Sequence, residues 1–112
     1  MVRVCSFAIK DAFPVTEHHT LVIPKRHVAD YFDLHQPERN AIEAMLHEQR
    51  QLNLKQDHTV TGFNVGINAG ASAGQTVFHV HVHLIPRRDG DVADPRGGVR
   101  GVIPSKQRYY VL

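Results

Sequence analysis

The strongest constraint on this chain is a run of three histidines at alternate positions, His79, His81 and His83, separated by Val80 and Val82. Successive side chains of a β-strand point to opposite faces, so this spacing predicts a strand over residues 76–86 with the imidazoles on one face. Each buried imidazole has two ring nitrogens that need partners, which makes three of them a poor filling for a core. The run therefore predicts a functional face.

Two kinds of chemistry use such a face. Neutral imidazole is a common zinc ligand, and alternate histidines on a strand can share one ion. An imidazole nitrogen can also attack a phosphoryl group and form a phosphoramidate, while neighbouring imidazoles orient it and protonate the leaving group. The loop AGASAGQT directly before the run favours the second chemistry, because exposed backbone N–H groups with Gln75 and Thr76 can cradle a phosphate.

The size and charge of the chain limit its organisation and its partners. Its 112 residues, 42% of them hydrophobic, predict one domain, residues 1–112, with one modest core. The net charge of +2 is weak evidence for a polyanion, and no nucleic-acid partner is expected. Several arginines follow the histidines and form either a positive field for an anionic ligand or a solvated rim. They are Arg87, Arg88, Arg96, Arg100 and Arg108.

The cysteine content and the start of the sequence indicate the compartment. Cys5 is the single cysteine, which excludes an intrachain disulfide and a zinc site built from several cysteines. The first residues contain no long apolar run, so neither a signal peptide nor a membrane span is expected. A cytoplasmic protein without a membrane partner is the resulting prediction.

The remaining segments predict an α+β fold, in which a helix packs on an antiparallel sheet. Residues 2–10 and 19–24 are two strands of a hairpin with a long connection, and residues 61–70 are strand-like and interrupted by glycine. A short helix is expected within residues 26–34. The long helix spans residues 37–55, with Pro37 in its first turn, a helical repeat of apolar residues and His47 at the surface. Residues 99–103 are expected to be extended.

The motifs resemble a known family. HVHVHLI matches the alternating signature of the histidine triad (HIT) family, and HTLVIPKRH and AGQTVFHVHVHLIPRR resemble its bacterial members, including the dinucleoside polyphosphate hydrolases. The resemblance covers residues 7–88. It implies a HIT-like fold, an antiparallel sheet of about five strands with one long helix and a short helix, and a homodimer whose sheet continues across a two-fold axis.

The resemblance also implies an activity. Family members hydrolyse or transfer a nucleoside monophosphate from nucleotide–X substrates, such as dinucleoside polyphosphates or nucleoside phosphoramidates. His81 matches the nucleophile that carries the nucleotidyl intermediate. His83 would contact the phosphate or the leaving group, His79 would be a more buried supporting residue, and His27 matches a fourth histidine that supports the triad.

The expected substrate is a purine nucleotide, and further residues match the family's binding positions. Asn68, Gly74, Gln75 and Thr76 match positions at the phosphates or the leaving group. Asp11 matches a residue that binds ribose hydroxyls, and the alternative is a turn residue next to Phe13 and Pro14. A third set would form an apolar slot for the base, or simply belong to the core: Phe7, Ile9, Ala12, and Leu21 or Ile23.

Two other functions share these residues. The first is a nucleotide-binding regulatory protein with incidental hydrolysis. The second is a zinc-dependent hydrolase with His79, His81 and His83 as ligands. The leading hypothesis needs no tightly bound cofactor and no metal on the histidines, and Mg²⁺, where it matters, would neutralise the substrate's phosphates. The motifs AGQT and LIPRR favour polyphosphate substrates slightly, since the arginines could meet extra phosphates.

The chain departs from the family pattern at three points. Glu17 and His18 precede His19, where many relatives carry small residues or Pro-Gly. Some relatives hold structural zinc through cysteines near the N-terminus, and Cys5 alone would not form that site. An additional N-terminal helix of many relatives is not expected here.

Overall fold

The structure is a computed structural model that describes residues 5–109. Its strands are β1 (Ser6–Lys10), β2 (Thr20–Pro24), β3 (Gly62–Gly66) and β4 (Val82–Arg87). One long helix, α1 (Gln36–Gln56), lies between β2 and β3 in the chain. The 3₁₀ helices of the described residues are η2 (Tyr31–Asp33), η3 (Ala71–Ala73), η4 (Gly98–Val102) and η5 (Pro104–Lys106).

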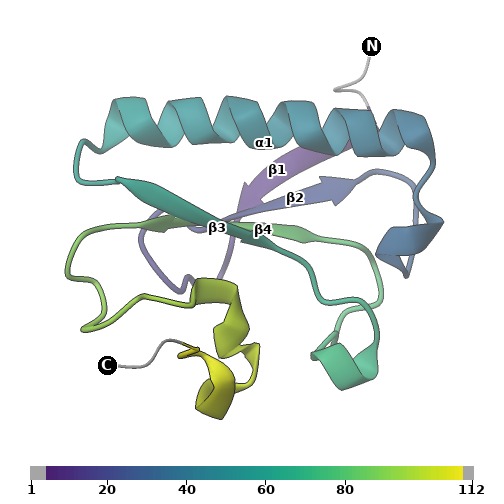
Figure 1. The fold of residues 1–112 in the computed structure, drawn as a ribbon. Coiled ribbons are helices and arrows are strands. Elements are labelled where there is room, and N and C mark those ends of the chain that lie inside the picture. The colour runs from purple at the N-terminus through teal and green to yellow at the C-terminus, as the bar shows by residue number, and fades with distance from the viewer. Residues whose placement is uncertain (1–4, 110–112) are drawn as a thin grey trace.

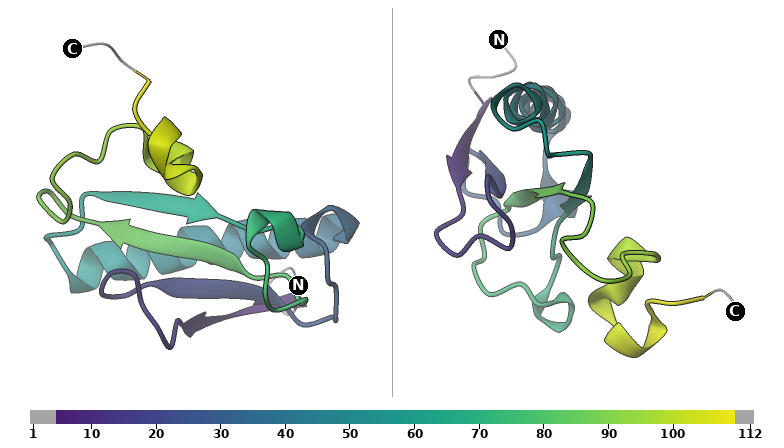
Figure 2. Two further views of the ribbon diagram at one scale, coloured as in Figure 1. Left: turned by 90° about the horizontal axis from the view of Figure 1, so that it is seen from below. Right: turned by 90° about the vertical axis from the view of Figure 1, so that its left-hand side faces the viewer.

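The strands form one antiparallel sheet in the order β1-β2-β4-β3 (Figure 2, left). The predicted hairpin of β1 and β2 is confirmed, with Phe7 opposite Ile23. Within residues 5–109 the sheet has four strands, one fewer than the sequence suggested. The predicted first strand began at residue 2, but residues 2–4 lie outside the described part and β1 begins at Ser6. β4 is a central strand, so its side chains have neighbours on both sides.

Helix α1 covers one face of the sheet, whereas the C-terminal turns and η3 lie on the other side (Figure 1). The core between α1 and the sheet includes Val22, Ile42, Val80 and Val82, all of which are buried. Burying these side chains removes apolar surface from water, at about 25 cal/mol per Å². Because side chains alternate along β4, the residues next to Val82 point to the opposite face, which the helix leaves open.

The boundaries of α1 agree with the predicted helix over residues 37–55 to within one residue at each end. At its start, the His35 N–H donates to a Glu38 carboxylate oxygen at 2.8 Å. Arg26 donates to both oxygens of the same carboxylate, at 2.8 and 2.9 Å, and this pairing lowers the pKa of Glu38 to about 2. His47 is exposed, as expected. No helix within residues 5–109 is long and apolar enough to cross a membrane.

Two local predictions are wrong. The strand expected over residues 76–86 begins only at Val82, because β2 pairs with β4 only between Thr20 and Val22. Before that point the Val80 N–H donates to the Val28 carbonyl at 2.7 Å, so the chain follows a loop instead of a strand neighbour. The segment expected to be extended near residues 99–103 is largely helical, as η4. The short helix expected within residues 26–34 is confirmed as η2.

Candidate active site

His81 and His83 lie together on the open face of the sheet. His83 is opposite Leu21 of β2 and Gly66 of β3. A Cβ built on Gly66 would meet no atom within 4 Å, so the space beside His83 is open on that side. The ring centroids of His81 and His83 are 5.2 Å apart. These two of the three predicted imidazoles therefore share one surface.

The position of the proton on His81 follows from its hydrogen bond. Its Nδ1 lies 2.9 Å from the carbonyl oxygen of His79. A carbonyl oxygen only accepts, so Nδ1 carries the hydrogen and donates it. In the neutral ring the other nitrogen, Nε2, then has a free lone pair. His81 is thus held in the tautomer that a nucleophile requires.

His19 supports His83 from behind. It is 2% exposed, and its Nδ1 accepts the Val15 N–H at 3.0 Å. An Nδ1 that accepts leaves the hydrogen on Nε2, and this Nε2 lies 2.9 Å from Nδ1 of His83. His19 therefore donates to His83, and His83 keeps its own hydrogen on Nε2. The chain of bonds ends in a donor beside His81.

The electrostatics keep both rings of this pair neutral. Burial lowers the pKa of His19 below its ordinary value of 6.5, although the Asp11 carboxylate opposes the change. Burial also lowers the pKa of His83, with further contributions from the neighbouring rings of His19 and His81 and with Asp11 again opposing. Neutral rings are what the tautomer assignment above requires, so geometry and electrostatics agree.

His79 forms a second pair, with His27. The Nε2–H of His79 donates to the Pro24 carbonyl at 2.8 Å, so its Nδ1 accepts, and His27 Nδ1 lies 3.2 Å away. His27 is exposed and His79 is only partly buried. His27 therefore does contact the triad, at His79, but the deeply buried additional histidine is His19.

His19 is the residue that sequence reasoning missed. It matches a family position, but the sequence pattern alone assigns it no role. The signal available was its place directly before the apolar strand 20–24. Because Leu21 lies opposite His83, a residue just before that strand is close to His83 as well. That pairing becomes visible only once the strand order is known.

Asp11 has both of its oxygens near partners. Its Oδ1 accepts the Phe13 N–H at 2.8 Å, which closes a local turn. Its Oδ2 lies 3.5 Å from Nε2 of His19. The turn role is therefore present, and the carboxylate also lies at the end of the His19–His83 pair. The ribose-binding role remains a prediction.

The predicted phosphate loop is held by Gln75. The Gln75 side chain is buried, donates to the Ala29 and Val77 carbonyls at 2.7 and 3.2 Å, and accepts the Gly70 N–H at 2.8 Å. Gly74 has a φ of +94°, a left-handed conformation that favours glycine. Thr76 is exposed. Gln75 thus shapes the loop from inside, while Thr76 remains available to a ligand.

Two cavities lie beside the paired rings of His81 and His83. The first, which we call the hairpin cavity, has a volume of about 300 Å³. It is lined by Phe7, Leu21, Ile23, Val77, His79 and His81. Phe7, Leu21 and Ile23 thus lie where an apolar slot was predicted, whereas Ile9 and Ala12 do not line it.

The second cavity, which we call the C-terminal cavity, has a volume of about 420 Å³ and lies between β3, β4 and η4. His19, His83 and Asn68 are in its wall. The adjacent rings of His81 and His83 therefore lie between two cavities, the hairpin cavity beside His81 and the C-terminal cavity beside His83. Asn68 is on the side of His83, which suits its predicted position near the leaving group.

The metal-binding capacity of the site is limited by the tautomers. Among residues 5–109, the one group of three potential ligands with ligand atoms within 4.8 Å of one another is Asp11, His19 and His83. This group includes neither His79 nor His81, the other two ligands of the alternative zinc hypothesis. Nε2 of His19 carries a hydrogen because Nδ1 accepts from the Val15 N–H. A metal at Nε2 would need the lone pair of that nitrogen, so the hydrogen would move to Nδ1 and face the Val15 N–H, which is also a donor. The group fits a hydrogen-bond chain better than a metal centre.

Arg87 and Arg88, directly after the triad, are held by acidic side chains. Arg87 donates to both oxygens of Asp91, and Arg88 pairs with Asp57 at 2.9 Å. The hydrogen bond from the Thr59 hydroxyl, and after it the one from Arg88, hold the pKa of Asp57 well below its usual range, and Arg87 does the same for Asp91. The Arg100 guanidinium lies over the Tyr109 ring. Two of the five arginines, Arg87 and Arg88, are therefore paired with carboxylates of their own surroundings.

Comparisons with known proteins agree with this geometry. The family model described as HIT domain matches residues 5–90. The chain is 45% identical over 82 residues to an uncharacterised HIT-like protein of Mycoplasma genitalium, covering 73% of this chain and 57% of that protein. It is 36% identical over 89 residues to the asymmetrical bis(5'-nucleosyl)-tetraphosphatase of Schizosaccharomyces pombe, covering 80% of this chain and 48% of that one. It thus spans about half the length of these curated relatives.

A solved structure shows the same fold. A Zn-bound histidine triad family protein from Mycobacterium smegmatis is 37% identical and superposes with a TM-score of 0.72, covering 80% of this chain and 64% of that one. The predicted α+β HIT-like fold is thereby confirmed. The sequence match, the shared fold and the histidines on the open face lead to one conclusion: this chain belongs to the histidine triad (HIT) family.

Proposed function

We propose that this chain hydrolyses or transfers the nucleoside monophosphate part of nucleotide–X substrates through a covalent nucleotidyl intermediate on His81. The observation that carries the proposal is the hydrogen bond from His81 Nδ1 to the His79 carbonyl, which leaves the Nε2 lone pair free beside His83. The relatives named as acting on dinucleoside polyphosphates support the substrate class.

The reaction has two balanced steps. The Nε2 lone pair of His81 attacks the α-phosphorus, a P–N bond forms, the P–X bond breaks, and X departs with the bonding electron pair. The Nε2–H of His83 donates a hydrogen bond to the departing atom or to a phosphate oxygen, where negative charge develops. Water then attacks the phosphorus and releases His81. The proton that this water loses balances the one that X takes up.

The hairpin cavity is the proposed site of the nucleobase. Its wall is mostly apolar and contains Phe7, whose ring is 39% exposed and available for stacking. The backbone of the loop 70–76 and the Thr76 side chain would contact the phosphates. Mg²⁺ would act on the substrate's phosphates and not on the histidines.

The test is the His81→Ala variant, assayed on a panel of dinucleoside polyphosphates and nucleoside phosphoramidates with and without Mg²⁺. Removing a nucleophile that no neighbour replaces should reduce kcat by about 10⁴-fold or more. Binding of a nucleoside monophosphate, measured by calorimetry, should survive. His47→Ala is a matched control, because His47 is exposed on α1. A fully active His81→Ala enzyme would refute the covalent step.

The regulatory alternative shares every site residue and is distinguished by rate. A protein that only senses nucleotides would bind them and turn them over extremely slowly, and its rate would not depend on His81. Steady-state measurements on the same panel separate the two functions.

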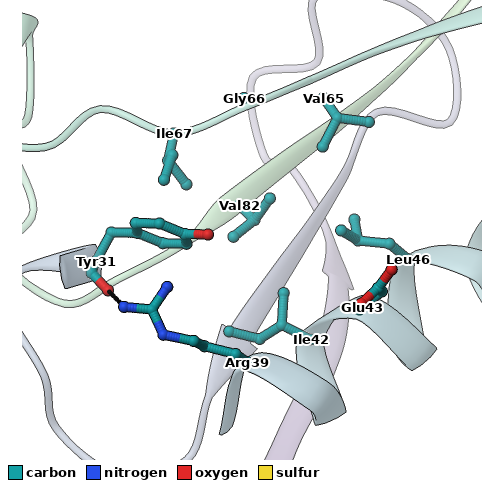
Figure 3. A pocket seen from close by; sticks show the side chains of 9 residues that line it. All are labelled: Tyr31, Arg39, Ile42, Glu43, Leu46, Val65, Gly66, Ile67 and Val82. Carbon is teal, nitrogen blue, oxygen red and sulfur yellow. Dashed lines mark hydrogen bonds between the residues drawn. The ribbon is translucent and has the colours of Figure 1, made fainter. Parts of the chain in front are cut away.

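We also propose a homodimer formed along the free edge of β3. Between α1 and this edge strand lies a groove of about 380 Å³ with Ile42, Leu46 and Val65 in its wall (Figure 3). An unpaired strand edge gains hydrogen bonds when a second copy pairs with it, and Val65 is 49% exposed there. Family resemblance supports this arrangement. Sedimentation at micromolar concentration tests it, with twice the mass of the chain expected.

A further inference from the structure

We propose that the C-terminal cavity is the leaving-group site and that it selects an uncharged, apolar substituent on X over a second phosphate chain. The inference rests on the proposed function, because it assumes attack by His81. It concerns which nucleotide–X compounds are used, a choice that the motif itself leaves open.

The direction of departure follows from the positions of the two rings. A nucleotide with its base in the hairpin cavity meets His81 from that side. In phosphoryl transfer the attacking and leaving atoms lie roughly in line on opposite sides of phosphorus. X therefore leaves on the side away from His81, toward His83 and the C-terminal cavity. His83 lines that cavity, together with Asn68.

The wall of this cavity is predominantly aliphatic, and its two histidines, His19 and His83, are the neutral rings described above. Within the described part of the chain, neither Lys nor Arg lines it. Its aliphatic side chains are Val15, Val65, Ile67, Ile85, Val99 and Val102. A polyphosphate placed there would lose water without gaining a cation, which is costly for a charged group. An apolar substituent would instead bury its own surface against these side chains.

The nearest charges reinforce the preference. The Asp11 carboxylate lies 3.5 Å from Nε2 of His19, which is in the wall of this cavity, and its negative charge disfavours an anionic group there. Arg87 lines the adjoining cavity, which shares Asn64 and Gly98 with this one. However, Arg87 is held by Asp91 at 2.7 and 2.8 Å and by Asn64 at 2.7 Å. Its charge is therefore compensated before any substrate arrives.

The experiment compares substrates that differ only in the charge at the far end of X. Two adenosine 5'-phosphoramidates, one of n-butylamine and one of β-alanine, have the same P–N bond and similar length, but only the second ends in a carboxylate. Diadenosine tetraphosphate is the third substrate. We expect kcat/KM for the butylamine compound to exceed that for the β-alanine compound by about tenfold or more. The apolar end of butylamine gains from contact with the aliphatic wall, whereas the carboxylate of β-alanine loses water there.

A pair of variants tests whether the cavity causes the difference. Val99→Lys places a cation in the wall, at a position that is 63% exposed and tolerant of a long side chain. It should reduce the selectivity ratio by about fivefold or more and raise the relative rate on diadenosine tetraphosphate. Val92→Lys is the matched control, because Val92 is 47% exposed in the same C-terminal segment but does not line this cavity. Its ratio should match that of the unchanged protein.

The outcomes separate this inference from the proposed function. If the protein turns over none of the three substrates, the proposed function fails and the inference with it. If the protein is active through His81 but prefers the anionic substrates, or if Val99→Lys leaves the ratio unchanged, the function stands and the apolar leaving-group site is refuted.

Discussion

Two histidine pairs flank His81, and they look alike until burial is considered. In each pair a residue near β2 contacts a triad histidine: His19 with His83, and His27 with His79. The ring centroids are 5.1 and 5.2 Å apart. In the first pair the His19 ring is buried and accepts a backbone N–H, that of Val15. In the second pair the His27 ring is exposed.

The difference arises from where each residue lies along β2. His19 precedes Thr20, whose register partner is Leu84 in the middle of the sheet. His27 follows Pro24, where the chain has left the sheet. A hydrogen bond that excludes water fixes one tautomer and leaves an unsatisfied group if it is removed, while water can replace an exposed bond. The buried pair should therefore control the chemistry, and the exposed pair should only adjust it.

In this comparison the largest expected effect comes from removing the supporting histidine of each pair, His19 or His27. His19→Ala leaves His83 without its donor and should lower kcat by about 10²–10³-fold, comparable to the loss of one transition-state donor. His27→Ala removes an exposed bond and should lower kcat by about tenfold at most. Both are measured in steady state on one nucleotide substrate.

Controls make this comparison decisive. Thermal melts establish that each variant folds, and His19→Gln, whose amide N–H can reach toward His83, should recover part of the rate if the donor matters. Equal losses in the two alanine variants would show that burial does not distinguish the pairs.

The pH profile sharpens the comparison. Burial lowers the pKa values of both His19 and His83. The part of the acid limb of kcat/KM that is set by this pair should therefore lie below pH 6.5. Asp11→Asn should shift the limb to still lower pH, because the Asp11 carboxylate raises both pKa values. A limb at or above pH 6.5 would contradict the assignment of neutral rings.

Folding stability should change in the same pH range. Below pH 6.5 the unfolded chain binds protons at His19 and His83 before the folded chain does. Stability is therefore complete above the unfolded pKa and falls as the pH decreases toward the lower folded values. Urea unfolding at a series of pH values measures this loss, and His47→Ala should leave its pH dependence unchanged.

The smallest effects concern the loop before the triad, where a buried and an exposed residue are again neighbours. Gln75→Ala removes three hydrogen bonds inside the loop and should cost about 1–3 kcal/mol of unfolding free energy. Thr76→Ala should stay within about 0.5 kcal/mol. Denaturant unfolding of both variants tests this, and a larger loss in the Thr76 variant would reverse our assignment of their roles.

Much of the fold could be predicted because its signals are local. The helical repeat and Pro37 placed α1 to within one residue at each end. An alternating segment and a short apolar run ended by proline predicted the β1–β2 hairpin. The start of β4 could not be predicted in this way. It depends on where β2 ceases to be a neighbour, and residues 76–81 have the composition of a strand without a strand beside them.

The candidate site divides along the same line. The alternation of His79, His81 and His83 is a property of the sequence itself, and it was enough to indicate the family and to suggest His81 as the proposed nucleophile. Which ring each histidine meets, which nitrogen carries its proton, and the apolar wall beside His83 were decided only by the tertiary structure. The physical reason is that hydrogen-bond partners and burial are properties of neighbours in space, and His19 and His83 become neighbours only when β2 and β4 pair.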